Sequence, residues 1–326
     1  MAVYTEVSDQ QLAAFVARFG IGELLAAKGI AEGVENSNYL IHTSVGLFIL
    51  TLYEKRVHEA DLPFFLGLME HLSGRGVVCP RPVKDARGEA LGRLAGRPAA
   101  IVTFLDGMSI RRPSVAHCRA LGEALARLHQ GGADFRFMRK NALSVEGWRP
   151  LFEAAAPRAD GVRPGLAREI EAPLAALERD WPRDLPVGNI HADLFPDNVF
   201  FIGKEVSGVI DFYFACTDAL AYDLAICLNA WCFEPDCSFN LTKGQALLSG
   251  YGRLRPLAEA EARALPLLAR GAALRFLLTR LVDWLNVPPG ALVKPKDPIE
   301  NLRKLRFHER FASAAEYCLI ALSARS

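Results

Sequence analysis

The sequence changes character near Asp106 and Gly107, and this change constrains the fold more than any other feature of the chain. Before it, β-branched and aromatic runs dominate; after it, most segments have the periodicity of amphipathic helices, as in residues 114–130. A chain of 326 residues, of which 51% are hydrophobic, is long enough to form two packed lobes. We therefore expect one lobe over residues 1–106 and a second over residues 107–326.

The first part of the chain predicts a small α+β lobe. The runs SNYLIHT and LFILTLYE flank a turn at residues 44–46, a pattern typical of an antiparallel hairpin. The other predicted elements are a short helix between Ser8 and Gly20, a helix over about residues 61–72, and a strand pair that ends at AAIVTFLDG, residues 99–107.

The second part of the chain predicts a larger, mainly helical lobe. Its clear β signal is VFFIGKEVSGVID, residues 199–211, which turns at Gly203 and Lys204 as a short hairpin. The fold class expected from the whole chain is therefore α+β: a small lobe with an antiparallel sheet and a helix, followed by a larger helical lobe.

Polar residues stand at both ends of this second hairpin. His191, Asp193 and Asn198 have the H-x-D-x-x-x-x-N spacing of a kinase catalytic loop, and Asp211 opens a D-F-x segment thirteen positions after Asn198. Asp and Asn also commonly cap turns, which is the alternative interpretation. That alternative would require the spacing, the following strand and the second aspartate to coincide by chance.

Phosphoryl transfer requires a carboxylate that takes the proton of an attacking hydroxyl, together with hard oxygen ligands for Mg²⁺. We assign the first role to Asp193. Asn198 and Asp211 are the candidate Mg²⁺ ligands, because the hairpin brings their positions together at one end. We expect His191 to support the loop through hydrogen bonds, with direct catalysis as the alternative.

Two segments of the first lobe are candidates for binding ATP. One is a polar loop before the first hairpin, whose backbone N–H groups could cover phosphates; it lacks G-x-G-x-x-G, so an ordinary polar turn is the alternative. The other leaves the last predicted strand, where exposed backbone could meet an adenine edge, although such residues are more often core. The candidates are Glu32, Gly33, Val34, Glu35, Asn36, Ser37 and Asn38 in the loop, and Phe104, Leu105 and Asp106 at the exit.

Charge and hydropathy favour a small-molecule substrate. The chain has 38 basic and 37 acidic residues without long runs, which predicts neither a nucleic-acid nor a membrane partner. Its start has no basic region followed by an apolar core, and no apolar run reaches the roughly 18 residues typical of a membrane span. We expect a cytoplasmic protein, and the sequence does not predict its oligomeric state.

Several phrases resemble a known family. HADLFPDN and IDFYFA, with LGEALARLH before them and AYDLAICLNAW after them, are similar to the aminoglycoside phosphotransferase-like kinases, and most closely to bacterial homoserine kinases. The resemblance implies a bilobal protein-kinase-like fold, ATP and Mg²⁺ as cosubstrates, and transfer of phosphate to the side-chain hydroxyl of L-homoserine. By motif it gives Asp193 as the base, Asn198 and Asp211 as metal ligands, and residues 32–38 as the phosphate loop.

The sequence departs from the general kinase pattern at two positions. Thr51 stands where the third strand usually presents a cation to the phosphates. Lys55 or Arg56 could replace that cation, with Glu59 as its partner, and a solvated strand end is the alternative for both. Tyr213 stands where D-F-G has glycine, so we expect no backbone flip of the D-F-G type.

A late apolar helix carries the candidate substrate-binding residues. A free amino acid needs a cation for its carboxylate and acceptors for its ammonium, and RFLLTRLVDW supplies Arg275, Arg280 and Asp283. An exposed helix face is the alternative for each of them. Asp223 is expected to cap its helix. Two other functions stay open: phosphorylation of another small alcohol, such as choline, methylthioribose or an aminoglycoside, and nucleotide binding without catalysis.

Overall fold

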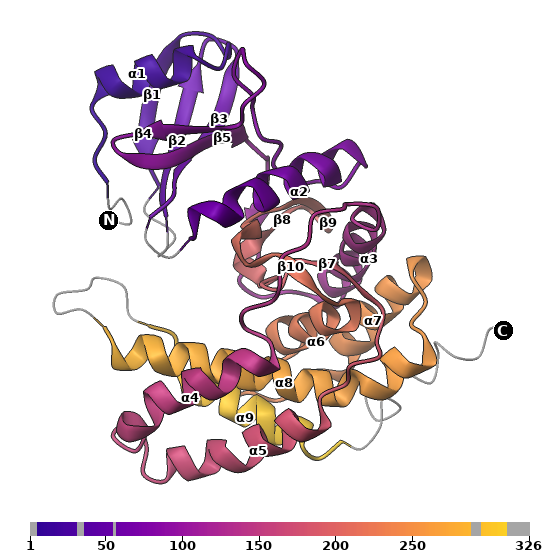
Figure 1. The fold of residues 1–326 in the computed structure, drawn as a ribbon. Helices are drawn as coiled ribbons and strands as arrows, with labels where there is room; N and C mark the ends of the chain where they lie inside the picture. Colours follow the sequence, from indigo (N-terminus) through magenta and orange to yellow (C-terminus); the bar gives the residue numbers. More distant parts are fainter. Residues whose placement is uncertain (1–4, 31–35, 55–56, 288–294, 312–326) are drawn as a thin grey trace.

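The protein folds into two lobes, of which the smaller contains a sheet with a helix across it (Figure 1). The computed structural model describes residues 5–30, 36–54, 57–287 and 295–311. The small sheet has five antiparallel strands in the order β1-β2-β3-β5-β4. The elements of this lobe are α1 (Asp9–Ala17), β1 (Leu24–Gly29), β2 (Ser37–Thr43), β3 (Gly46–Leu52), β4 (Leu91–Leu94) and β5 (Arg97–Thr103).

The small lobe has its own core between α1 and the sheet. Ser8 caps α1 by accepting a hydrogen bond from the Gln11 backbone N–H, and the apolar face of the helix packs on buried side chains of β2, β3 and β5. The predicted hairpin is confirmed: β2 and β3 pair from Ser37 opposite Leu52 to Thr43 opposite Gly46.

Strand β1 was not predicted from the sequence. Its segment, LLAAKG, has none of the β-branched or aromatic residues that mark strands, and most of its side chains are exposed. It forms because it adds to the free edge of β2, so tertiary pairing creates a strand for which the local sequence shows no preference.

Helix α2 (Leu62–Gly74) connects the two lobes through its packing. It follows a short 3₁₀ turn (Glu59–Asp61) and was predicted within two residues of its observed ends. Its buried side chains, among them Phe65, Leu68 and Met69, belong to the hydrophobic core of the larger lobe, whereas the sheet and α1 form a separate core. The chain passes between the lobes again at residues 104–107, close to the proposed boundary after residue 106.

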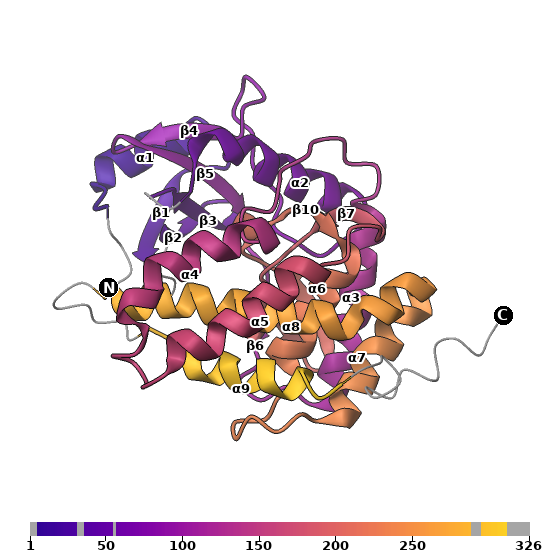
Figure 2. The ribbon, with the colours of Figure 1, turned by 60° about the horizontal axis from the view of Figure 1, so that its bottom comes forward.

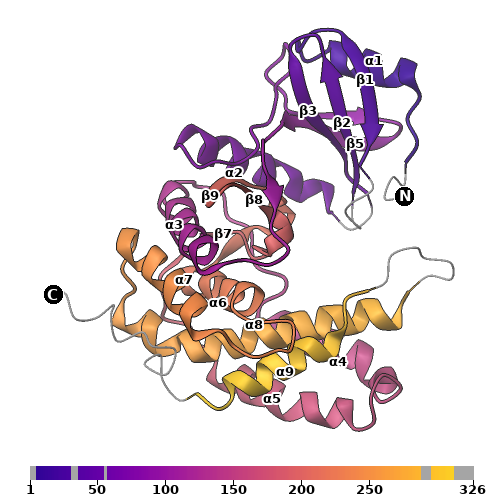
Figure 3. The same cartoon turned by 180° about the vertical axis from the view of Figure 1, so that it is seen from behind.

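The larger lobe is helical apart from two small sheets (Figures 2 and 3). Helix α8 runs across it and packs against α4, α6 and α9, while α3 packs along α7. Within the described residues, none of the helices has the length and apolarity needed to span a bilayer. The elements are β6 (Met108–Ser109), α3 (Val115–Gly131), α4 (Val145–Ala159), α5 (Leu166–Asp180), β7 (Val187–Ile190), β8 (Val199–Ile202), β9 (Glu205–Val209), β10 (Cys216–Ala219), α6 (Leu220–Trp231), α7 (Leu241–Leu254), α8 (Glu259–Leu285) and α9 (Pro298–His308).

Candidate active site

The catalytic loop leaves strand β7 at His191 and ends in a 3₁₀ turn, Pro196–Asn198, which leads directly into β8. Between them Ala192 has a φ of +63°, a left-handed conformation that costs free energy for a residue with a Cβ. Such a conformation persists only where the surroundings hold it. The contacts of the loop backbone therefore show what fixes the position of Asp193.

Asp223 of α6 binds the backbone of the loop. Its carboxylate accepts hydrogen bonds from the backbone N–H of His191, at 2.7 Å, and of Ala192, at 2.9 Å, and it contacts His129 Nε2 at 3.2 Å. Burial disfavours the charged carboxylate, but the hydrogen bond from His129 and the other contacts outweigh it and lower the pKa of Asp223. The expectation that Asp223 caps α6 is wrong: the helix begins at Leu220, and the carboxylate is used to bind the loop.

The His191 ring is fully buried and bonded to backbone on both sides. Its Nδ1 accepts from the Asp193 N–H at 3.3 Å, and its Nε2 donates to the carbonyl oxygen of Ile210 at 2.9 Å. Burial lowers the pKa of His191, which favours the neutral ring. With both nitrogens occupied, the ring ties Asp193 to the segment that carries Asp211, and these contacts favour the supporting role over direct catalysis.

Asp193 and Asn198 are in direct contact. The Asn198 Nδ2 donates to the backbone oxygen of Asp193 at 2.8 Å and to its Oδ2 at 3.1 Å, which leaves the Asn198 Oδ1 as the atom suited to a metal. Burial raises the pKa of Asp193 to about 8; the nearby Arg275 opposes this shift, and Asp211 and Asp197 add to it. A carboxyl whose pKa lies near neutrality is suited to accept a proton during a reaction.

Asn198 and Asp211 stand at the same end of the β8–β9 hairpin. Val199 pairs with Val209, and the Ile210 N–H donates to the Asn198 carbonyl oxygen at 3.0 Å, so the predicted proximity of the two positions is confirmed. Asp211 has a φ of +65° and an exposed position next to the 3₁₀ turn Phe212–Phe214. The sequence spacing was sufficient to place this pair correctly.

These donors fit a Mg²⁺ ion that shares its coordination with nucleotide phosphates. Within the described ranges no group of three or more His, Cys, Asp and Glu side chains could hold a metal alone. Mg²⁺ is usually bound by one or two protein oxygens together with substrate phosphates and water, which matches one amide and one carboxylate. A cation at Asp211 would also oppose the negative charge that raises the pKa of Asp193.

The nucleotide-binding candidates of the small lobe are only partly described. Glu32, Gly33, Val34 and Glu35 lie outside the described residues. In the rest of that loop, Asn36 Oδ1 accepts from the Glu54 N–H at 3.2 Å, Ser37 Oγ donates to the Glu54 carboxylate at 2.8 Å, and Asn38 Oδ1 accepts from Thr51 Oγ1 at 2.7 Å. This half of the predicted loop is thus fixed to β2 and β3, and β2 already begins at Ser37.

The second nucleotide-binding candidate is the segment that leaves β5. Phe104 is 36% exposed, and the carbonyl oxygen of Asp106 accepts a hydrogen bond from Ser207 Oγ at 2.7 Å. Leu105 lies against Gly208, where a Cβ would come within 2.9 Å of its side chain. The segment is therefore held against β9, and its role toward adenine stays a prediction.

Thr51, at the strand position where kinases usually have a lysine, carries no charge. Thr51 is buried and bonded to Asn38, and Lys55 and Arg56 lie outside the described residues. Glu59, the expected partner of such a cation, instead pairs with Arg93 of β4 at 2.6 Å on the surface.

Tyr213 makes the contact between the D-F-x segment and the small lobe. Its hydroxyl lies 3.2 Å from that of Tyr53, which follows β3, and its ring packs edge-on against Phe65 of α2. A tyrosine fixed on two sides in this way agrees with the expectation that this segment does not flip as D-F-G does.

A cavity of about 600 Å³ opens beside Asp193. Of the predicted substrate residues it brings together Arg275, Arg280 and Asp283, together with Asp197 and Lys296. Three acidic residues elsewhere in the large lobe, Asp218, Glu234 and Asp236, do not line this cavity.

Arg275 and Arg280 differ in their partners. Arg275 is 1% exposed; its Nη1 donates to the Ala192 carbonyl oxygen at 2.5 Å, and its Nε has no hydrogen-bond partner among the described residues. Arg280 is already paired with Glu300, with Nη1 2.8 Å from Oε2. A buried guanidinium without a carboxylate partner is the stronger candidate for binding the carboxylate of a substrate.

Sequence reasoning missed Arg139, which also lines this cavity. Its Nε donates to Asp61 at 2.7 Å and its Nη1 to the Ala215 carbonyl oxygen at 3.2 Å, so it links the segment before α2 to the large lobe. It lies in an irregular stretch, FRFMRKN, where no periodicity marks one cation above its neighbours.

Comparison with known proteins agrees with this geometry. Residues 26–257 match the model of a family described as the phosphotransferase enzyme family. The homoserine kinase of Methylobacterium nodulans is 68% identical over 317 residues, which cover 97% of this chain and 99% of that protein. The homoserine kinase of Parvibaculum lavamentivorans is 65% identical over 321 residues, which cover 98% and 100%.

Solved structures confirm the kinase-like bilobal fold. The amicoumacin kinase hAmiN, solved with AMP-PNP and Ca²⁺, has a TM-score of 0.69 at 18% identity, covering 93% of this chain and 92% of that chain. Spectinomycin phosphotransferase, solved with ADP and its antibiotic, has a TM-score of 0.68 at 14% identity, covering 96% and 98%. The chain belongs to the phosphotransferase enzyme family and, within it, to the homoserine kinases.

Proposed function

We propose that this protein is an ATP-dependent homoserine kinase, which transfers the γ-phosphate of ATP to the side-chain hydroxyl of L-homoserine. The product is O-phospho-L-homoserine, a precursor of threonine. The observation that carries the proposal is the position of Asp193: it contacts Asn198, lies near Asp211, and lines a cavity that also contains the buried Arg275. Relatives named homoserine kinase at 64–69% identity over nearly the whole chain support it.

In this mechanism Asp193 orients the homoserine hydroxyl and accepts its proton as the oxygen bonds to the γ-phosphorus and ADP leaves. Asn198 Oδ1 and the Asp211 carboxylate would hold Mg²⁺, and the ion would supply positive charge to the phosphates. His191 and Asp223 hold the loop in place and do not touch the substrate. Residues 32–38 would cover the phosphates of ATP, and Phe104, Leu105 and Asp106 would receive its adenine.

Arg275 binds the carboxylate of L-homoserine, with Arg280 as the second candidate, and the acidic side chains of the cavity receive the ammonium. A zwitterion therefore fits the mixed charge of this site. We place the enzyme in the cytoplasm, with no nucleic-acid or membrane partner.

ADP release with Mg²⁺ tests the proposal when homoserine, serine, choline and an aminoglycoside are offered in parallel. We expect turnover with L-homoserine and a kcat/KM at least tenfold lower for each of the other acceptors. Turnover with none of the four would disprove kinase activity. A preference for choline or the aminoglycoside would show that the enzyme phosphorylates another class of alcohol.

A further inference from the structure

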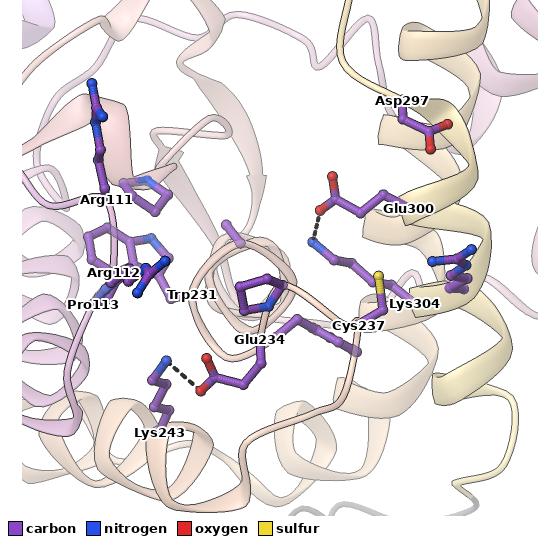
Figure 4. A pocket seen from close by; sticks show the side chains of 15 residues that line it. Arg111, Arg112, Pro113, Trp231, Glu234, Cys237, Lys243, Asp297, Glu300 and Lys304 are labelled. Carbon is purple, nitrogen blue, oxygen red and sulfur yellow. Dashed lines mark ion pairs between the residues drawn. The ribbon is translucent and has the colours of Figure 1, made fainter.

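A second cavity, of about 680 Å³ (Figure 4), shares none of its lining residues with the cavity beside Asp193. Pro196 lines it, whereas the neighbouring Phe195 and Asp197 line the substrate cavity. Trp231 also lines it, and the Trp231 indole donates a hydrogen bond to the Leu194 carbonyl oxygen at 2.7 Å. The wall of the second cavity is therefore continuous with the catalytic loop.

Two buried lysines form part of this wall. Lys304 is 5% exposed and lies 2.6 Å from Glu300; its Nζ also donates to the Asn229 carbonyl oxygen at 2.9 Å. Lys243 is 8% exposed and lies 2.7 Å from Glu234. Figure 4 shows both ion pairs facing the cavity, one from α9 and one from the region of α7. Each pair is neutral by itself.

Three further cations give the cavity its charge. Arg111, Arg112 and Arg303 are exposed, and none of them forms an ion pair with any of the residues that the structure describes. Five basic side chains thus face three acidic ones. Guanidinium groups bind phosphate and carboxylate groups through paired hydrogen bonds, so the excess charge favours an oxyanion.

The remaining lining is apolar, with Pro113, Trp231 and Phe233 among its members. An inorganic ion would leave these side chains without contacts. A cavity of this volume, lined by both cations and aromatic side chains, has the size and composition of a site for a small organic ligand.

Glu300 connects this cavity to the substrate cavity. Its Oε1 lies 2.6 Å from Lys304 in the second cavity, and its Oε2 lies 2.8 Å from Arg280 in the substrate cavity. An anion that attracts Lys304 would weaken its hold on Glu300 and leave that carboxylate freer to pair with Arg280. Occupancy of one cavity would therefore change the charge offered by the other.

We propose that the second cavity binds a small organic molecule carrying a phosphate or carboxylate group, and that its occupancy changes the affinity for the acceptor substrate through Glu300. The two possible oxyanions share the same recognition by arginine. The experiment separates them by using glycerol 3-phosphate and succinate as probes.

Binding is measured by isothermal titration calorimetry, both on the enzyme alone and on enzyme saturated with AMP-PNP, Mg²⁺ and L-homoserine. We expect at least one probe to bind in both conditions. Arg111→Glu/Arg112→Glu should weaken that binding at least tenfold. The matched control is Arg119→Glu/Arg127→Glu, which makes the same charge change on exposed positions of α3 outside the cavity and should alter binding less than twofold.

Binding of neither probe, displacement of the probe by AMP-PNP, or equal affinity in both double variants would overturn the site. Failure of homoserine or AMP-PNP to bind would count against the proposed kinase function and not against the second cavity. The cavity would still be tested, because probe binding to the two double variants can be compared without these ligands. For the coupling, a saturating probe should change KM for homoserine at least threefold, and Glu300→Gln should abolish this change while the probe still binds. An unchanged KM in the unsubstituted enzyme would refute the coupling.

Discussion

The catalytic loop and the nucleotide-facing side of the small lobe are built in different ways. Residues 191–198 are held by buried side chains from three helices: His129 of α3 through Asp223 of α6, and Arg275 of α8. At the strand position where kinases place a cation, the small lobe has only Thr51, bonded to a neighbouring asparagine. The backbone of residues 191–198 is thus fixed by the protein itself, whereas Thr51 carries a buried hydroxyl and no charge.

Of the substitutions that test this comparison, replacement of Asp193 should change activity most. Asp193→Asn keeps the size of the side chain but removes the proton acceptor, so we expect kcat to fall by roughly 10³-fold, within the range found for general bases. Affinity for ATP, measured by calorimetry, should change less than threefold. Asp184→Asn, in the exposed segment before β7, is the control for a lost surface carboxylate. Retained activity in Asp193→Asn would remove Asp193 from the base role.

The second prediction concerns Arg275 and a matched pair of substrates. 3-Amino-1-propanol is L-homoserine without its carboxylate. The kcat/KM for L-homoserine divided by the kcat/KM for 3-amino-1-propanol therefore measures how much the enzyme gains from binding the carboxylate. Arg275→Met should reduce this ratio by about 10²-fold, the cost of an unpaired charge in a buried site.

Arg280→Met should reduce the ratio less, because Arg280 is already paired with Glu300. Arg275→Lys keeps the charge and should recover part of the ratio, which separates carboxylate binding from general damage to the loop. If Arg280→Met had the larger effect, the two arginines would exchange roles.

The third prediction tests whether the loop depends on Asp223. Asp223→Asn replaces one of the two accepting oxygens by an NH₂ group, which cannot accept a hydrogen bond from a backbone N–H. We therefore expect the free energy of unfolding to fall by about 2 kcal/mol and kcat to fall about tenfold. Urea denaturation and steady-state kinetics measure the two effects. Asp236→Asn, in an exposed turn, should change stability by less than about 0.5 kcal/mol. Unchanged kcat in Asp223→Asn would show that the loop holds its position without this carboxylate.

The smallest effect is expected at Thr51. Thr51→Val removes the hydrogen bond to Asn38 but no charge, so KM for ATP should rise by less than fivefold, equivalent to about 1 kcal/mol. Nucleotide titrations of Thr51→Val and of Thr51→Ser, which keeps the hydroxyl, measure it. A rise of a hundredfold or more in Thr51→Val would place the hydroxyl directly on the phosphates and make the two regions more alike.

The parts of the site that could be predicted are those encoded by adjacent residues. The hairpin after Asn198 sets the distance to Asp211, and a turn at Gly203 is visible in the sequence, so this pair was placed correctly. Asp223 and Arg139 were misjudged or missed because their partners are far away in the chain: Asp223 binds a loop 31 and 32 positions earlier, and Arg139 binds Asp61, 78 positions earlier. Strand β1 was missed for a different reason: its pairing with β2, and not its own residue types, determines its conformation.

The packing of α2 has a consequence for how the enzyme opens. The buried face of α2 belongs to the core of the large lobe, which also includes Tyr53 and Val102 of the small lobe. If the sheet separated from α2, the helix would therefore stay packed on the large lobe. Such a separation would move the five strands together with α1, a body that the chain joins to the rest where it leaves β3, enters β4 and leaves β5. Product release, if it requires such a movement, would leave the cavity beside Asp193 and its support from Arg139 unchanged, so that the acceptor side stays assembled between turnovers.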